Sequence, residues 1–388
     1  MIVPYRTAAV KQPRERSAQH EQPYTRTENI RAPFAAGGMG IGVSRCRLAG
    51  AVAHEGAMGV ISAAQIGYDQ DDFRLHPESA NLRELPRQIK RAKALAFGRG
   101  MIGVNIMAVT QLYSQYVKTA CEAGPDAIIT GAGLPLSLPQ DAMGFDVLLA
   151  PIVSSVKALQ VILKYWDKKY HRTADFLVAE GPLAGGHLGF SFETLAHLET
   201  YDFRREVRGM VAAKRIFEEK YQRSIPLFVA SGILTEEDVT NTLKLGADGV
   251  QVASRFVTTK ECDASMAFKK AYLQAEKEDT VVIKSPVGMP GRAIRNPFVE
   301  RMQAGKETIS GCYQCLKACD PRTAPYCITQ ALIRAVQGQV EDGLIFCGAR
   351  VGELNRITTV KEAIRELGFG KQRKEPQPIL QTRKEAFA

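Results

Sequence analysis

The sequence predicts an α/β fold, a (β/α)8 or TIM barrel with a C-terminal helical, cysteine-rich extension. Eight short apolar runs alternate with amphipathic stretches, and they extend over about 250 residues, as such a barrel requires. The last three runs each end in a small-residue loop, as at the end of a barrel where ligands bind. An open doubly wound sheet is the alternative, but it would typically open on a GxGxxG motif.

The predicted strands are continuous apolar runs, as expected for parallel strands that are buried on both faces. They cover Ala32–Ala36, Met58–Ala63, Met101–Met107, Ala127–Thr130, Val147–Val153, Phe176–Glu180, Pro226–Ser231 and Gly249–Ala253. The stretches between them repeat apolar residues at helical spacing, which predicts amphipathic helices. These helices cover Ser44–Glu55, Leu82–Ala96, Gln111–Glu122, Ser155–Lys168, Arg204–Tyr221, Glu236–Leu245 and Ala264–Glu278.

The chain divides into four predicted parts. Residues 1–30 are polar and aperiodic, which indicates an extended N-terminal arm, and residues 31–300 form the barrel with a lid excursion after its eighth strand. Residues 301–370 form the cysteine-rich extension, in which two helices are expected between residues 328 and 367. Residues 371–388 are a basic C-terminal tail.

The composition is that of a soluble globular enzyme, with 45% apolar and 24% charged residues in a chain of 388. The sequence has no apolar run near the roughly 18 residues of a membrane span and no apolar signal core at its start, so a cytoplasmic protein is expected. The net charge is +10, but residues 1–31 and 371–388 supply +6 of it. A nucleic-acid partner is therefore not expected.

The most informative stretch is Glu180–Phe190, which reads EGPLAGGHLGF directly after a predicted strand. His187 lies among glycines, and glycine lets the backbone approach a flat ligand closely. The loop is thus suited to hold an imidazole over a substrate. The alternative, that His187 is only a turn residue, stays open at this point.

Two more strand-end loops follow, at residues 230–233 (ASGI) and 253–256 (ASRF). Unpaired amides at strand ends and helix N-termini favour a phosphate, so this pair predicts a phosphate site. Asn105 ends another predicted strand and offers both a donor and an acceptor to a planar ring. A simple strand-end cap is the alternative for Asn105.

Seven motifs in this order resemble the nitronate monooxygenase family, formerly called 2-nitropropane dioxygenases, and the related FMN-dependent enoyl-acyl carrier protein reductase. The resemblance covers about Ala32 to Val299. The motifs are GGMG with LAGAVAHEGAMGVI, GVNIM, GAGLP, EGPLAGGHLGF, ASGI, DGVQVASRF and GMPGRAIRN. Ser231 stands where the family usually has glycine, and Ala253-Ser254 stands in place of Gly-Thr.

The resemblance implies a TIM barrel that binds FMN without a covalent bond. It implies that His187 faces the flavin and acts on the substrate, that Asn105 bonds the isoalloxazine edge, and that backbone amides hold the phosphate. The implied FMN-binding residues are Gly37, Gly38, Met39, Asn105, Gly131, Glu180, Gly185, Gly186, Ser231, Gly232, Ile233, Gln251, Ala253 and Ser254. Among these, the amides of Gly232, Ala253 and Ser254 are the implied phosphate donors.

The activity implied is oxidation of alkyl nitronates by O2 to a carbonyl compound and nitrite, with His187 as acid or base. As imidazolium, His187 would hold the anion; as imidazole, it would take an α-proton from a nitroalkane. One alternative is an NAD(P)H-dependent flavin oxidoreductase that acts on an enoyl thioester or quinone. A flavin-binding sensor or assembly subunit is the non-enzymatic alternative, and a homo-oligomer stays open.

The GMPGRAIRN motif, residues 288–296, predicts a tight loop that returns to the mouth of the barrel. Arg292 or Arg295 would then help to hold an anionic substrate or the FMN phosphate, because a guanidinium offers paired donors to such oxygens. A solvated charge cluster is the alternative.

Five of the eight cysteines crowd into residues 312–347. Four of them have the spacing C-x2-C-x3-C-x7-C, and these are Cys312, Cys315, Cys319 and Cys327. Four thiolates complete a zinc or iron–sulfur site, but the spacing matches neither common ferredoxin run. A reduced structural cluster without metal is the favoured interpretation, and a metal site is the alternative.

Overall fold

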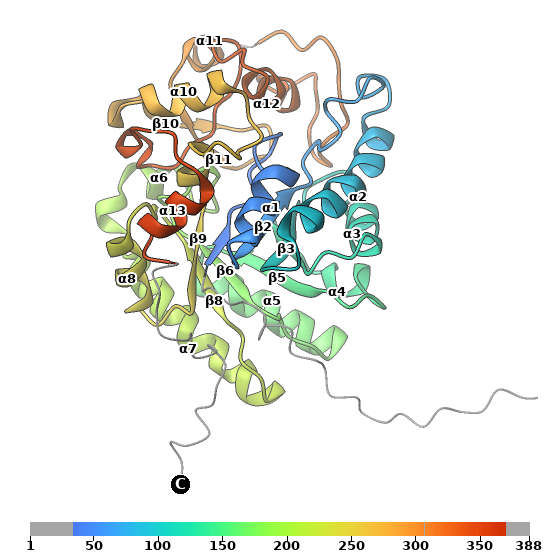
Figure 1. The fold of residues 1–388 in the computed structure, drawn as a ribbon, viewed down its shortest axis with the longest axis vertical. Coiled ribbons are helices and arrows are strands. Elements are labelled where there is room, and N and C mark those ends of the chain that lie inside the picture. The colour runs from blue at the N-terminus through green and yellow to red at the C-terminus, as the bar shows by residue number, and fades with distance from the viewer. Residues whose placement is uncertain (1–33, 306, 370–388) are drawn as a thin grey trace, which may run out of the picture.

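The computed structural model describes residues 34–305 and 307–369 (Figure 1). The predicted N-terminal arm, the basic tail and the first two residues of the first predicted strand lie outside these residues. Eight parallel strands close into a barrel in the order β1-β2-β3-β4-β5-β6-β8-β9, which confirms the predicted fold class. They are β1 (Phe34–Ala36), β2 (Met58–Ser62), β3 (Met101–Met107), β4 (Ala127–Gly131), β5 (Leu148–Val153), β6 (Leu177–Glu180), β8 (Leu227–Ala230) and β9 (Gly249–Val252).

The barrel closes where β1 pairs with β9, with Ala36 opposite Val252. Its strands are buried on both faces, which explains why each is a continuous apolar run in the sequence. Inside the barrel, Phe176 and Phe228 meet edge to face with ring centroids 5.8 Å apart. The outward residues pack against the surrounding helices and form a separate cluster that includes Trp166. Both layers are therefore filled by side chains, and the open space lies at the strand ends.

Nine helices of the described chain lie in the barrel part. They are α1 (Cys46–His54), α2 (Pro77–Ala96), α3 (Tyr113–Glu122), α4 (Leu138–Asp141), α5 (Val156–Tyr170), α6 (Phe192–Ala196), α7 (Phe203–Tyr221), α8 (Glu236–Leu243) and α9 (Ser254–Val257). The caps are those expected from the sequence: Thr235 and Asp238 form a capping box at α8, and Ser155 caps α5. Helix α2 begins at Pro77 rather than Leu82, because proline suits the first turn of a helix.

The short helix α9 does not cover the outside of β9 by itself. That place is taken by α13 (Val360–Glu366), which packs with β1, β9 and α1 in one apolar cluster. Buried Arg255 of α9 ties the two helices together, because its Nη2 lies 2.5 Å from a carboxylate oxygen of Glu366. The extension therefore completes the helical ring of the barrel.

A second, antiparallel sheet lies over the strand ends and was not predicted. Its order is β10-β11-β7, with β10 (Thr280–Lys284), β11 (Pro290–Ile294) and β7 (Gly186–His187). The prediction of a loop over residues 288–296 is thus wrong for its central part, which is strand β11. Gly291 pairs with His187 and Arg292 pairs with Gly186, so β11 supports the histidine loop directly. Glycine and proline in this segment concealed the strand, because they are normally depleted in strands.

The remaining helices lie at the top of the molecule in Figure 1, beside this sheet. They are α10 (Met266–Gln274), α11 (Pro297–Ala304) and α12 (Ile328–Val336). Short 3₁₀ turns lie at Leu198–Thr200, Lys277–Asp279 and Val351–Glu353. Helices α12 and α13 are the two that were predicted after residue 328. Among the residues that the structure describes, no helix is both long and apolar enough to cross a membrane.

Candidate active site

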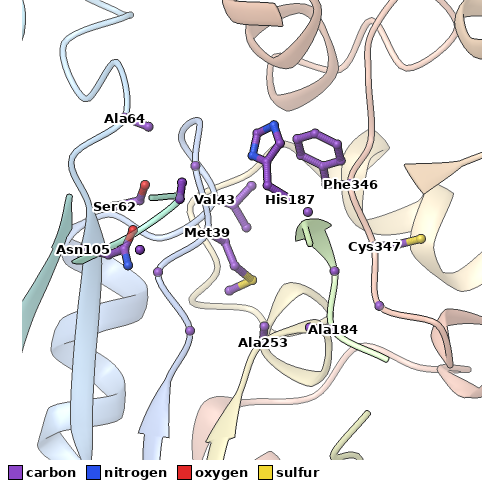
Figure 2. A pocket seen from close by; sticks show the side chains of 18 of the residues that line it. Met39, Val43, Ser62, Ala64, Asn105, Ala184, His187, Ala253, Phe346 and Cys347 are labelled. Atoms are coloured by element: carbon purple, nitrogen blue, oxygen red, sulfur yellow. The ribbon is translucent and has the colours of Figure 1, made fainter. Parts of the chain in front are cut away.

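A cavity of about 250 Å³ lies at the carboxyl ends of the barrel strands. Its volume is near the lower end for small-molecule sites, about 300 Å³. The strand ends form its floor, and a segment around Phe346 and Cys347 forms part of its wall. In Figure 2, Ser62 and Asn105 lie on one side, while His187 and Phe346 lie on the other.

The structure brings together all the residues predicted to bind FMN, and His187 with them. They come from the ends of six barrel strands, β1, β3, β4, β6, β8 and β9, and from the loops that follow. The residues on the cavity are Gly37, Gly38, Met39, Asn105, Gly131, Glu180, Gly185, Gly186, His187, Ser231, Gly232, Ile233, Gln251, Ala253 and Ser254. Their convergence fits one ligand with a flat part and a phosphate.

Three polar side chains face this cavity without a hydrogen-bond partner in the described chain. They are the amides of Asn105 and Gln251 and the carboxyl of Glu180, at the ends of β3, β9 and β6. Their free donors and acceptors therefore fit a ligand that carries both kinds of group, as a flavin does.

The phosphate end is marked by unpaired backbone amides. Within the described residues, the amides of Gly232, Ala253 and Ser254 donate no hydrogen bond to the protein. Gly232 has a φ of +63°, and a Cβ built there would lie 3.2 Å from Leu183. A glycine is thus needed for the backbone conformation, and a larger residue would fill the cradle. This arrangement fits a bound phosphate.

Arg350 lines the same end of the cavity and was not predicted from the sequence. Its Nη1 donates to the carbonyl of Gly232 at 2.7 Å and to Asp238 Oδ2 at 2.7 Å. Bonds to Glu353 and Asp238 raise its pKa further, so the group is a permanent cation. It comes from the turn after Gly348, far from the barrel in sequence and without a motif of its own.

Position 38 requires glycine for a second reason, besides the predicted close approach of the backbone to a flat ligand. A Cβ at this position would lie 2.4 Å from the Cβ of Asn105, which is an impossible contact. The chain after β1 passes this closely over β3, and in doing so it leaves the Asn105 side chain at the cavity. The glycine therefore serves the placement of Asn105.

His187 is held at the cavity by the small sheet. Its Nε2 lies 2.8 Å from Ser285 Oγ, and its ring meets Phe346 edge-on, with centroids 5.0 Å apart (Figure 2). Burial lowers the pKa of His187 from 6.5 to about 4. The imidazole is therefore neutral at pH 7, which favours a base over an imidazolium that holds an anion.

Burial acts in the opposite direction on Glu180. It raises the pKa of this carboxyl from 4.5 to about 8, so the side chain is largely protonated at pH 7. A protonated carboxyl both donates and accepts a hydrogen bond, which suits hydroxyl groups of a ligand.

We expect Glu180→Gln to stabilise the flavin-free protein increasingly as the pH rises from 5 to 9. Because the pKa of Glu180 is higher in the folded state than in the unfolded state, its contribution to stability is fully present below pH 4.5. That contribution is lost as the pH rises through about 8. Glutamine has no such dependence, so the melting temperature of the variant should exceed that of the parent at high pH only. Thermal melts at several pH values test this, with exposed Glu193→Gln as the control. A constant difference would contradict it.

The structure does not bring Arg292 and Arg295 to the cavity. Arg292 is buried, and its Nη1 donates to the carbonyls of Pro182 and Ala184 at 2.7 and 2.5 Å. Pairing of β11 with β7 directs Arg292 under the histidine loop, so it braces that loop. Arg295 is exposed and is absent from the cavity lining. This placement does not support the predicted substrate role of the pair.

The four spaced cysteines, Cys312, Cys315, Cys319 and Cys327, line a second cavity of about 310 Å³. All eight cysteines are free thiols. Across residues 34–305 and 307–369, no three His, Cys, Asp or Glu side chains form a group that could hold a metal ion.

Comparison with known proteins gives a consistent result. The family model described as nitronate monooxygenase matches residues 21–369. A probable nitronate monooxygenase of Staphylococcus saprophyticus is 25% identical over 295 residues, which are 71% of this chain and 78% of that protein. A nitroalkane oxidase structure from Streptomyces ansochromogenes superposes with a TM-score of 0.67 at 18% identity, over 89% of this chain and 97% of that one.

A further relative from Mycobacterium tuberculosis has another name, (3aS,4S,5R,7aS)-5-hydroxy-7a-methyl-1-oxo-octahydro-1H-indene-4-carboxyl-CoA dehydrogenase. It is 27% identical over 293 residues, which are 73% of this chain and 68% of that protein. The matching relatives thus differ in the substrates that their names state.

Proposed function

The chain belongs to the nitronate monooxygenase family and is a flavin-dependent oxidoreductase, and on that premise we propose that it oxidises alkyl nitronates with FMN and O2. The products would be a carbonyl compound and nitrite. The observation that carries this proposal is a neutral imidazole, His187, at a cavity lined by unpaired amides. The sensor alternative is set aside because the chain belongs to a family of enzymes.

The chain offers distinct groups to each part of FMN. The amides of Gly232, Ala253 and Ser254, with the Arg350 cation nearby, would hold the phosphate. Asn105 and Gln251 would bond the ring, and protonated Glu180 would bond hydroxyl groups. When bound, FMN supplies the electron acceptance that no side chain provides.

His187 would act on the substrate through its free ring nitrogen. Ser285 binds Nε2, and with the proton on Nε2 the other nitrogen, Nδ1, has a free lone pair. That lone pair would take the proton from the carbon next to a nitro group, which leaves the nitronate in place. Phe346 packs against this ring in a T-shaped contact, which fixes one side of the imidazole. A preformed nitronate would need no such proton transfer.

A second candidate is oxidation or reduction of an acyl thioester, with NAD(P)H as a candidate electron donor. The relative named as a carboxyl-CoA dehydrogenase, which matches 73% of this chain, favours it. The same FMN contacts would serve both reactions, so they do not separate the two candidates.

One pair of assays on the purified protein tests the proposal. Mixing with a preformed propyl-2-nitronate in air should consume O2 and release nitrite. Anaerobic mixing with NADH or NADPH should leave the yellow absorbance unchanged over the same time. Rapid loss of that absorbance with NAD(P)H, together with no nitrite from the nitronate, would overturn the proposal in favour of the thioester reaction.

We expect Arg350→Met to raise the Kd for FMN about tenfold, because one charge-assisted bond contributes about 1.5 kcal/mol. The difference from the parent should shrink at high salt, since the interaction is electrostatic. Flavin titration at two salt concentrations measures both effects. Exposed Arg295→Met is the matched control and should bind FMN as the parent does. Equal Kd values for both variants would remove Arg350 from the phosphate site.

A further inference from the structure

The four spaced cysteines lie in the segment between α11 and α12. We propose that Cys312, Cys315, Cys319 and Cys327 bind a [4Fe–4S] cluster beside the active site. All four line one cavity of about 310 Å³, although the last of them lies 15 residues after the first. Cysteine thiolates are the usual ligands of such clusters, in sets of four. This proposal does not depend on the proposed substrate.

The segment is fastened to the barrel at its second cysteine. The carbonyl of Cys315 accepts from the amide of Gln111 at 3.1 Å, and the amide of Lys317 donates to Val109 at 3.0 Å. Leu316 forms a bridge with Thr110 between these two bonds. Cys315 is therefore held on the loop after β3, not on a free surface turn.

The fourth cysteine is fixed by a helix. Cys327 is the N-cap residue of α12, although its side chain makes no capping hydrogen bond. The sulfur of Cys312 accepts from the amide of Gln314 at 3.4 Å. Hydrogen bonds from amides to cysteine sulfur tune an iron–sulfur cluster, and a helix N-terminus favours its negative charge. The first ligand thus already has a supporting donor, and the fourth lies at a helix N-terminus.

A cluster places different demands on the four sulfurs than a single ion does. Tetrahedral zinc requires four sulfurs within about 2.3 Å of one centre. No three described His, Cys, Asp or Glu side chains form a group that could hold one metal ion, while the four cysteines line one common space. In a [4Fe–4S] cluster each cysteine binds a different iron atom, so the four sulfurs need not meet at one centre.

The second cavity adjoins the active site. Cys315, Leu316 and Ile328 line both cavities, so one layer of residues separates them. A cluster on Cys315 would therefore lie against the wall of the flavin cavity. A structural zinc site would have no comparable reason to be placed there.

The test is the metal content of the full-length protein, purified without oxygen and treated with ferrous iron and sulfide. We expect about four iron and four labile sulfide per chain and an EPR signal after reduction with dithionite. Cys312→Ala and Cys315→Ser should lose at least half of the iron and sulfide. Cys46→Ala, a half-buried cysteine outside the set, should keep them.

Cys312 is exposed, so its replacement should leave the fold and the flavin content unchanged, and a loss of iron in that variant reports on the site itself. Parent protein with no more iron and sulfide than Cys312→Ala would overturn the proposal. One zinc per chain without labile sulfide, lost on the same substitution, would also overturn it in favour of a structural ion.

Discussion

His187→Ala should lower kcat/KM for a neutral nitroalkane by about 10²- to 10⁴-fold, the usual contribution of a general base. The side chain lies at the cavity beside Ser285 and Phe346, and the backbone of β7 holds the loop without it. Flavin content should therefore stay at the parent level. With a preformed nitronate the loss should be smaller, because no proton has to be removed. Steady-state kinetics on both substrate forms measure the difference.

The pH profile gives an independent check of the same residue. Because burial lowers the pKa of His187 to about 4, the acid limb of kcat/KM should lie near that pH and not near 6.5. The limb should vanish in His187→Ala. His197→Ala is the matched control, since His197 is exposed and absent from the cavity lining. Near-parent turnover of a nitroalkane by His187→Ala would show that the histidine is only a loop residue.

Gly232→Val should weaken FMN binding by about 100-fold or more, the loss of roughly two charge-assisted bonds. The backbone at Gly232 has a φ of +63°, which a β-branched residue avoids, and its Cβ would lie 3.2 Å from Leu183. The displaced loop would withdraw its amide from the phosphate. Flavin content after purification and an FMN titration of the stripped protein measure the effect.

The backbone strain that valine causes at position 232 needs a separate control, at a glycine away from the cavity. Gly246 has a φ of +94° on the exposed turn after α8, where a Cβ would meet only Val211 at 3.4 Å. Gly246→Val should lower the melting temperature in the same way as Gly232→Val but keep its FMN. Full flavin occupancy in Gly232→Val would remove the phosphate from this loop, and equal flavin loss in both variants would show that strain alone is responsible.

The barrel could be predicted because its strands are determined locally. A strand that is buried on both faces must be apolar throughout, and this leaves a run such as residues 101–107 that is visible in the sequence. Within the described residues, the ends of the eight predicted strands differ from the observed ones by one residue or none. The small sheet was missed because β7 has two residues and β11 contains glycine and proline. Its pairing depends on residues about 100 positions apart.

For the candidate site, motifs pointed to residues that the fold then gathers at one cavity, including His187 and Gly232. The structure places Arg292 and Arg295 away from the cavity lining, which the sequence could not indicate. A charged residue near a glycine turn indicates only that a cation is present. The direction in which its side chain points depends on strand pairing and burial. Pairing with β7 turns Arg292 towards backbone carbonyls, and a distant turn delivers Arg350 to Gly232.

By itself, the sequence determined the barrel, its order of strand ends and many of the residues that line the cavity, because parallel strands bring their carboxyl ends together. Only the tertiary structure decided the protonation of His187 and Glu180, since burial depends on the whole wall around a group. It also decided that α13 completes the helical ring and that the spaced cysteines share one cavity beside the active site. These features arise from contacts between distant parts of the chain, and such contacts leave no local pattern.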